Sequence, residues 1–143
     1  MFYSVPAEYI DDIWPRVVEQ INLASEYSEN LYSVTDAYKS CSSGKQQLWI
    51  LTVDDRIVST STTTITKYLC GKKIFKVVAC GGNEVVKNKN LMMDSFKKFA
   101  SDNGCSSIEF SGRPGWKRLL REYNPQFVAV TYKINLQEGS IDE

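Results

Sequence analysis

Two ionisable side chains in the second half of the chain have the chemistry needed for proton transfer or anion binding. Glu109 could act as a general base if a neighbouring group raised its pKa near a substrate amine. The alternative is an ordinary strand carboxylate, exposed or paired. Arg113 could clamp an anion or a carboxylate, or could instead tie its corner of the chain to backbone carbonyls. The chain contains no His, which excludes Ser–His and Cys–His nucleophilic pairs.

Thiols are the other reactive groups in the sequence. None of the four cysteines is spaced as CxxC: they are Cys41, Cys70, Cys80 and Cys105. Without paired Cys or His we expect no zinc site and no other bound metal. We expect four free, mostly buried thiols in a reducing compartment.

Composition describes an ordinary soluble domain. The chain has 143 residues, of which 43% are hydrophobic and 24% charged, enough for one domain with a real core. Seventeen basic and seventeen acidic residues cancel, so no global field favours nucleic acid. The charge is uneven, because residues 1–36 carry seven acids and one Arg, a balance of −6, whereas residues 67–98 carry eight Lys and two acids, a balance of +6.

Targeting signals are not evident in the sequence. No apolar run approaches the length needed to cross a bilayer, and the first residues lack a basic region followed by an apolar run. We therefore expect no membrane partner, and a location in a cytoplasm or in a particle packaged from one.

Apolar periodicity and turn residues predict the elements that position these side chains. After a short extended start at 1–5, we expect helices at 6–28, 33–43 and 91–102, strands at 48–53, 57–68, 74–80 and 107–110, and a last strand at 127–136. Pro15 predicts a break in the first helix near Trp14. Residues 137–143 are expected to form a polar tail.

A tight corner connects the strand at 107–110 to a short helix. Gly112 can turn the chain through dihedrals that other residues resist, and Pro114 suits the first turn of a helix. Trp116 and the two leucines that follow it recur at helical spacing, so we expect Trp116 to be largely buried.

The order of these elements predicts an α/β fold in one domain, a mixed sheet with helices on its faces. Three strands form an antiparallel meander. The helix at 91–102 then crosses over, so that the strands at 74–80 and 107–110 are predicted to be parallel neighbours.

This order resembles the fold of the GNAT superfamily of N-acetyltransferases, and more narrowly the small GNAT-like proteins of tailed bacteriophages. The matching motifs are Trp14-Pro15, Gly44-Lys45-Gln46-Gln47-Leu48-Trp49, Phe99-Ala100 with Gly104-Cys105, Ile108-Glu109, and Gly112-Arg113-Pro114-Gly115-Trp116. The resemblance implies a GNAT-like domain over residues 1–136, with 137–143 as the tail.

The resemblance also implies an acetyl-CoA site where the two parallel strands splay apart, with the pyrophosphate on backbone N–H groups at the start of the next helix. The residues implied at that site are Val85, Val86, Lys87, Asn88, Lys89 and Asn90. The family signature Q/R-x-x-G-x-G/A is not met there, since Glu84, Lys87 and Lys89 replace its defined positions. The lysines could block close approach of the backbone, could add charge for phosphates, or could form a solvated basic loop.

The resemblance implies catalytic or cofactor-binding roles for only a few residues. Tyr123 could protonate a leaving thiolate, as a helix-borne tyrosine does in GNAT enzymes, or could be a core or rim aromatic. Gly81 and Gly82 could allow a pantetheine chain to approach, or could simply end a strand. The weak catalytic candidates are therefore Glu109 and Tyr123.

Two functions from different classes follow. One is an acetyl-CoA-dependent N-acetyltransferase, or a descendant of one with a degenerate pyrophosphate signature. The other is a non-catalytic phage protein, virion-associated or host-interacting, that uses the scaffold to bind virion or host proteins. Neither hypothesis includes a nucleic-acid partner, because basic and aromatic residues do not interleave as single-strand binders require.

Overall fold

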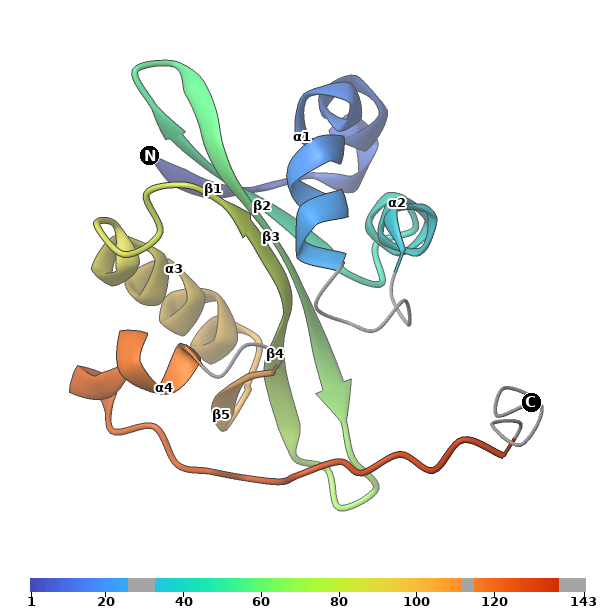
Figure 1. The fold of residues 1–143 in the computed structure, drawn as a ribbon, viewed down its shortest axis with the longest axis vertical. Helices are drawn as coiled ribbons and strands as arrows, with labels where there is room; N and C mark the ends of the chain where they lie inside the picture. The colour runs from blue at the N-terminus through green and yellow to red at the C-terminus, as the bar shows by residue number, and fades with distance from the viewer. Residues whose placement is uncertain (26–32, 112–114, 137–143) are drawn as a thin grey trace, which may run out of the picture.

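A five-stranded mixed sheet lies at the centre of the described residues, 1–25, 33–111 and 115–136, in a computed structural model. Figure 1 shows α1 and α2 on one face of this sheet, and α3 and α4 on the other. The elements are β1 (Phe2–Val5), η1 (Ala7–Tyr9), α1 (Ile10–Ser25), α2 (Val34–Ser42), β2 (Gln47–Val53), β3 (Arg56–Lys67), β4 (Lys73–Gly82), α3 (Lys89–Asp102), β5 (Ser107–Phe110), α4 (Trp116–Leu119) and η3 (Arg121–Tyr123).

The strands follow one another across the sheet in chain order, β1-β2-β3-β4-β5. Strands β1 to β4 pair antiparallel, whereas β4 and β5 pair parallel through the α3 crossover. The predicted mixed α/β sheet, with its parallel pair, is therefore confirmed.

Helix α1 runs without the expected break at Pro15, which lies inside it. Proline removes only one N–H, the donor that would bond to the carbonyl of Asp11, and its φ is compatible with a helix. The apolar face of the helix continues past the proline, because Ile10, Val17 and Ile21 are all buried. Burial of this face on both sides of Pro15 keeps one continuous helix, and the predicted break is wrong.

Helix α2 has Ser33 as its N-cap. The Ser33 hydroxyl accepts a hydrogen bond from the Asp36 N–H, and the Asp36 carboxylate accepts one from the Ser33 N–H, which forms a capping box. A ring contact joins this helix to α1, since the Trp14 and Tyr38 centroids are 5.4 Å apart. The two helices thus form one layer on their face of the sheet.

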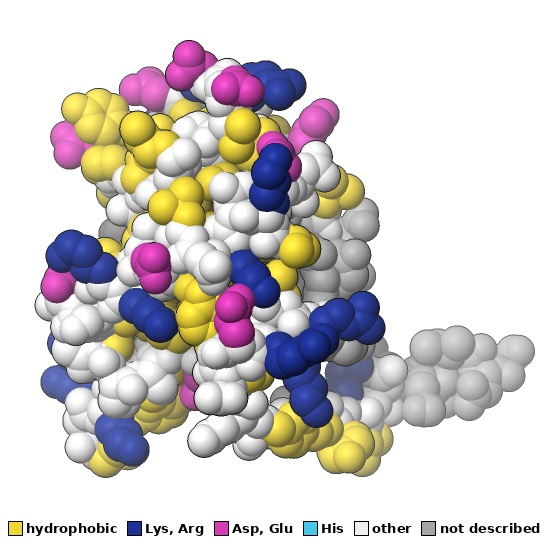
Figure 2. Space-filling view, turned by 90° about the vertical axis from the view of Figure 1, so that its left-hand side faces the viewer, with side chains coloured by type: hydrophobic (Ala, Val, Ile, Leu, Met, Phe, Trp, Pro, Cys, Tyr) yellow, Lys and Arg dark blue, Asp and Glu magenta, His cyan; other side chains and the backbone are white. Residues whose placement is uncertain are grey.

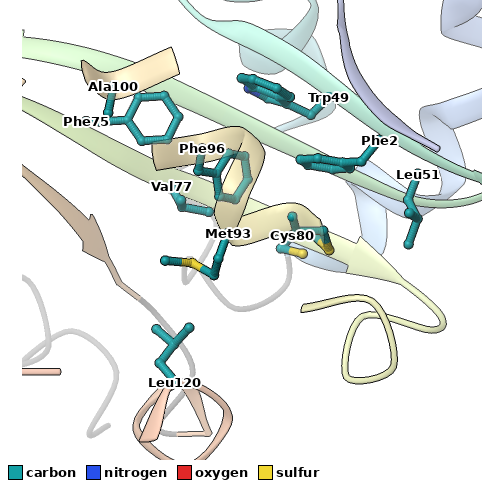
Figure 3. Close-up of a cluster of buried hydrophobic side chains, with 11 residues drawn as sticks. Phe2, Trp49, Leu51, Phe75, Val77, Cys80, Met93, Phe96, Ala100 and Leu120 are labelled. Carbon is teal, nitrogen blue, oxygen red and sulfur yellow. The ribbon is translucent and has the colours of Figure 1, made fainter. Parts of the chain in front are cut away.

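Each face of the sheet has its own hydrophobic core. On the α1 and α2 side, the core is formed by Ile10, Val17, Ile21, Ala37, Cys41, Leu48 and Ile50. The other core is aromatic, and Figure 3 shows Phe96 of α3 among Phe2, Trp49 and Phe75 of the sheet. The rings of Phe2 and Trp49 stack at 5.3 Å, and Phe96 meets both edge-on. Packing on both faces explains why the central strands are buried.

Strand β3 carries a buried polar stretch, Ser59–Thr63. Its hydroxyls have partners: Ser59 Oγ donates to the Gly81 carbonyl at 2.8 Å, and Thr63 Oγ1 accepts from Trp49 Nε1 at 2.9 Å. These bonds offset the cost of burying hydroxyls. This part of the threonine-rich strand therefore belongs to the interior.

The last predicted strand, 127–136, is wrong for this structure. Residues 124–136 have no helix or strand, and Figure 1 shows this segment leaving the body of the molecule. Its apolar side chains are exposed, including Val128, Tyr132 and Ile134 at 72%, 88% and 83%. A strand needs a neighbouring strand that shares backbone hydrogen bonds, and none of β1 to β5 pairs with this segment.

The expectations for Trp116, the corner, the tail and the cysteines are confirmed only in part. Trp116 is half-buried rather than largely buried, although its Nε1 donates to the Ser111 carbonyl at 3.1 Å. The corner at residues 112–114, including Arg113, and the tail at 137–143 lie outside the described residues. All four cysteines are free thiols: Cys41 and Cys80 are buried, Cys105 is intermediate and Cys70 is exposed. No helix among the described residues is long and apolar enough to cross a membrane.

Candidate functional site

Strand β5 ends halfway along its neighbour β4. Their parallel pairing starts at Ile74 with Ser107 and ends at Val77 with Phe110. Strand β4 continues beyond this point to Gly82. Among the described residues, its later half therefore has a strand neighbour only on the β3 side. On the other side of this half, no β5 residue pairs with the β4 backbone.

A β-bulge marks the same point on the β3 side. Thr62 pairs with Ala79 and Thr63 with Val77, so Val78 is the extra residue. Bulges bend a strand and re-aim its backbone groups and side chains. The bulge directly follows the last β4 residue paired with β5, so it lies beside the end of β5.

Gly81 allows α1 to pack closely against β4. A Cβ atom at this position would lie 2.3 Å from the carbonyl oxygen of Gln20. Gly82 has a φ of +112°, and there a Cβ would lie 2.4 Å from the Val58 carbonyl oxygen. Both glycines let protein backbone approach β4 closely, and an approach of a pantetheine chain to them stays a prediction.

The loop after β4 presents donors at the start of α3. Asn88 closes it, because its N–H donates to the Glu84 and Val85 carbonyls, each at 3.2 Å. Within the described chain, no backbone carbonyl accepts a hydrogen bond from the N–H groups of Val85, Val86 or Lys87. The first N–H groups of a helix also lack partners inside the helix. Donors and the positive end of α3 together suit an anion.

The two lysines of this loop behave differently. Lys87 is exposed and contributes its charge to the loop. Lys89 points to the region after α4, with Nζ 2.8 Å from Glu122 Oε1 and 3.3 Å from the Leu119 carbonyl oxygen. Lys89 therefore does not fill the loop, and its charge is largely neutralised by Glu122. Lys87 is the lysine placed to attract an anion.

Tyr123 meets the first turn of α3. Its hydroxyl donates to Asn90 Oδ1 at 2.5 Å, and Lys97 Nζ lies 4.8 Å from the ring centroid. Burial, followed by the charges of Glu122 and Asp94, raises the pKa of Tyr123, and Lys89 lowers it. The phenol thus keeps its proton at neutral pH, which is the state that a general acid requires.

Glu109 lies on the other face of the sheet. Its neighbours Ile108 and Phe110 pack against the aromatic core on the α3 side, and side chains alternate along a strand, so Glu109 points away from that side. Its register partner on β4 is Lys76. The structure therefore brings together Tyr123, Lys89 and Asn90, and it separates Glu109 from them.

Charged side chains on this side of the molecule are mixed in sign. Figure 2 shows the face toward which α3 and α4 lie in Figure 1, with lysines and arginines gathered in its lower half and acids at its top. The region around α4 contributes Lys117, Arg118 and Arg121, all exposed. This part of the surface could attract a phosphate-bearing ligand at longer range.

The surface also has a hollow that was not anticipated from the sequence. It has a volume of about 240 Å³ and is lined by Met1, Tyr3, Ile13, Arg16, Ile50, Thr52, Asp55 and Ile57. A hollow beside it shares Tyr3, Ile13, Arg16 and Ile50 and adds Asp12. The one available signal was Arg16, the single basic residue among the first 36. Its companions come from β1, β2 and β3, and only the fold brings them together. Elsewhere among the described residues, no group of three His, Cys, Asp or Glu side chains could hold a metal.

Comparison with known proteins bears on the fold. No protein-family model and no curated protein matches the sequence. Solved structures do match. A predicted acetyltransferase with acetyl-CoA from Clostridium acetobutylicum has a TM-score of 0.67 at 12% identity, covering 96% of this chain and 97% of that one. The chain has a GNAT-like fold.

Two further GNAT-like neighbours support the same conclusion. A ribosomal-protein-alanine N-acetyltransferase from Brucella melitensis biovar Abortus 2308 has a TM-score of 0.65 at 11% identity, over 95% of this chain and 99% of that one. An aminoglycoside acetyltransferase from an uncultured soil metagenomic sample has a TM-score of 0.70 at 8% identity, over 96% and 98%. These GNAT-like structures share the arrangement of the chain at identities that establish the fold alone.

Proposed function

We propose that this protein is an acetyltransferase-like protein that binds acetyl-CoA between β4 and β5 and transfers its acetyl group to an amine. One observation carries the proposal: β4 has a bulge at Val78 directly after its last pair with β5, and among the described residues its later half has no strand neighbour on that side. The GNAT-like fold supports it, since one structural neighbour was solved with acetyl-CoA.

The residues present fit this cofactor. Backbone groups of β4 beyond Val77 would hold the pantetheine part. Donors at Val85, Val86 and Lys87, with the start of α3, would hold the pyrophosphate, and the Lys87 ammonium would add charge attraction. When bound, acetyl-CoA supplies an acetyl group activated as a thioester.

Tyr123 is the residue of this chain that best suits a proton-holding role. Its hydroxyl lies at the first turn of α3, where it donates to Asn90, and its pKa is raised by burial and by nearby carboxylates. A phenol that stays protonated can donate its proton to a developing anion. Tyr123 is partly buried and packs against the aromatic core, while its hydroxyl stays at the surface.

Calorimetric titration with CoA tests the proposal. We expect saturable binding that weakens as salt increases, because screening reduces the attraction between phosphates and Lys87. Lys87→Glu should weaken binding, and a paired Lys87→Glu/Lys89→Glu variant should weaken it further. Lys72→Glu makes the same charge change at the exposed turn between β3 and β4, and it should bind CoA as the parent does. Absence of binding at millimolar CoA, in a sample shown to be folded, would contradict the proposal.

A second candidate is a non-catalytic phage protein that binds virion or host proteins. The observation in its favour is the tie between α3 and the region after α4, made by the Lys89–Glu122 pair and the Tyr123–Asn90 hydrogen bond. The separation of Glu109 from Tyr123 by the sheet also leaves no acid–base pair of the two catalytic candidates. Failure to bind CoA, together with co-purification of the protein with virions, would favour this function.

A further inference from the structure

We propose that the hollow between α1 and strands β1 to β3 binds a free α-amino acid with an apolar side chain, held at its carboxylate by Arg16 and at its ammonium by Asp55. The hollow lies at the β1 edge of the sheet, on the face that α1 covers. The proposed acetyl-CoA site lies at the β5 edge and extends to α3, which covers the opposite face (Figure 1). The inference is therefore independent of acetyl-CoA binding.

Three separate parts of the chain form this hollow. Helix α1 contributes Ile13 and Arg16, which are three residues apart and so lie on the same side of the helix. Tyr3 of β1 is the register partner of Ile50 of β2, and paired residues share a face of the sheet. Because Ile50 belongs to the core on the α1 side, Tyr3 faces α1 as well. Asp55, in the turn between β2 and β3, completes the wall.

Arg16 and Asp55 bring opposite charges to the same hollow. Both residues are exposed, and within the part of the chain that the structure describes neither side chain has a hydrogen bond or an ion pair. They also do not reach each other, which leaves room between them for a molecule that carries both charges. A guanidinium group matches the planar geometry of a carboxylate with two parallel N–H donors. Asp55 can accept hydrogen bonds from an ammonium group.

The charges around the hollow favour a zwitterion over a ligand with one charge. Asp12 lines the hollow beside it, which also includes Arg16. A simple anion would be attracted by Arg16 but repelled by Asp12 and Asp55, whereas a simple cation would be repelled by Arg16. An α-amino acid places a carboxylate and an ammonium on one carbon atom, so each charge of the ligand can face its opposite in the protein.

The size and the apolar walls of the hollow define the rest of the ligand. Its volume is about 240 Å³. Pockets for drug-sized ligands measure about 300–1,000 Å³, so a smaller molecule is expected here. Ile13 and Ile57 are only partly buried although both pack against the core on the α1 side. An aliphatic side chain such as that of leucine would cover both and remove apolar surface from water.

Nuclear magnetic resonance on the ¹⁵N-labelled full-length protein, titrated with L-leucine in the absence of CoA, tests the proposal. We expect saturable shifts of the backbone amides of Ile13, Arg16 and Asp55. Two analogues each remove one charge of the ligand, since 3-methylbutylamine lacks the carboxylate and 4-methylpentanoate lacks the ammonium. Each analogue should bind about tenfold more weakly than leucine, because a charge-assisted hydrogen bond is lost.

Variants assign each charge of the ligand to one side chain. Arg16→Gln should weaken leucine binding about tenfold and leave 3-methylbutylamine unaffected, because that analogue has no carboxylate. Asp55→Asn should weaken leucine binding to a similar degree without weakening 4-methylpentanoate. Asp55 has a φ of +61°, which Asn adopts readily, so this variant should fold. Asp54→Asn is its matched control, since Asp54 has a φ of +52° in the same turn and does not line the hollow. Arg118→Gln, on the α4 side, is the control for Arg16→Gln.

Three results would overturn the proposal. The first is the absence of saturable shifts up to the solubility limit of leucine, in a sample whose spectrum shows a folded protein. The second is a set of shifts confined to β4 and the loop at 83–90, which would place leucine in the region proposed for acetyl-CoA. The third is equal binding of leucine by the parent and by both Arg16→Gln and Asp55→Asn. Because no CoA is present, none of these results depends on the proposed function.

Discussion

Lys89 Nζ lies 2.8 Å from Glu122 Oε1, which ties the first residue of α3 to the turn that follows α4. The two side chains are 28% and 51% exposed, so water partly screens the pair. Exposed ion pairs of this kind contribute about 0.2–1 kcal/mol. The importance of the pair lies in its position, because it neutralises a cation beside the donors of Val85, Val86 and Lys87.

Removing the charge of Glu122 should strengthen CoA binding. In Glu122→Gln, Lys89 is no longer neutralised, and its charge becomes available to a phosphate. We expect the Kd for CoA to fall by roughly two- to fivefold, equivalent to about 0.5–1 kcal/mol. Glu8→Gln removes an exposed carboxylate near the N-terminus and should leave Kd unchanged. Equal affinities of Glu122→Gln and the parent, measured by calorimetry at low salt, would show that the pair lies outside the phosphate site.

Gly81→Ala should destabilise the fold. The new Cβ would lie 2.3 Å from the Gln20 carbonyl oxygen, so α1 and β4 must move apart. Overpacking of this kind costs about 1–3 kcal/mol, measured as the change in the free energy of unfolding in urea. Gly115→Ala is the matched control, since nothing lies within 4 Å of its Cβ and its φ is −62°. We expect the control to change stability by less than about 0.5 kcal/mol.

Local signals in the sequence were sufficient for most of the fold. Ser33 and Asp36 satisfy each other's backbone at the start of α2, and neither needs a distant partner to do so. The pairing of β4 with β5 followed from the helix between them, because a crossover constrains the direction of the next strand. Predictions of this kind depend on residues that are near one another in the chain.

The secondary-structure predictions that failed are those that depend on tertiary contacts. Pro15 signals a break locally, but the burial of Val17 and Ile21 after it keeps α1 continuous. The segment from Phe127 has the alternation of a strand, but none of β1 to β5 pairs with it. In both places the local sequence favours one secondary structure, but the structure that forms depends on the elements packed beside the segment.

The candidate loop could be located from the sequence but its contacts could not, and acetyl-CoA binding there stays a prediction. The motif alignment located the loop at 83–90, and the structure puts backbone donors there. The direction of Lys89 depends on Glu122, which is far along the chain, and no pattern in the sequence connects the two. For the same reason the partner of Tyr123, Asn90, appeared only with the fold.

Titration of Tyr123 should occur above the usual pH for tyrosine. Its pKa is raised from 10.0, first by burial and then by Glu122 and Asp94. A phenol is uncharged when protonated, so the folded protein holds this proton more tightly than the unfolded chain. The resulting stability is complete below about pH 10 and decreases as pH rises beyond it. The difference in ultraviolet absorbance between the parent and Tyr123→Phe, recorded against pH, isolates this phenol from the other seven tyrosines. A midpoint at or below that of a model tyrosine peptide would contradict the expectation.

Alkylation should separate the four thiols by their surroundings. Burial raises the pKa of Cys41 to about 11, and only the thiolate reacts, so Cys41 should resist iodoacetamide at pH 8 in the folded protein. Cys70 is exposed and should be labelled first. Mass spectrometry after digestion follows each site. Unfolding without reductant should make all four cysteines reactive, because none is in a disulfide. Two sites that remain unlabelled in the unfolded chain would reveal a disulfide, and early labelling of Cys41 would show that the core around α2 opens on the timescale of the reaction.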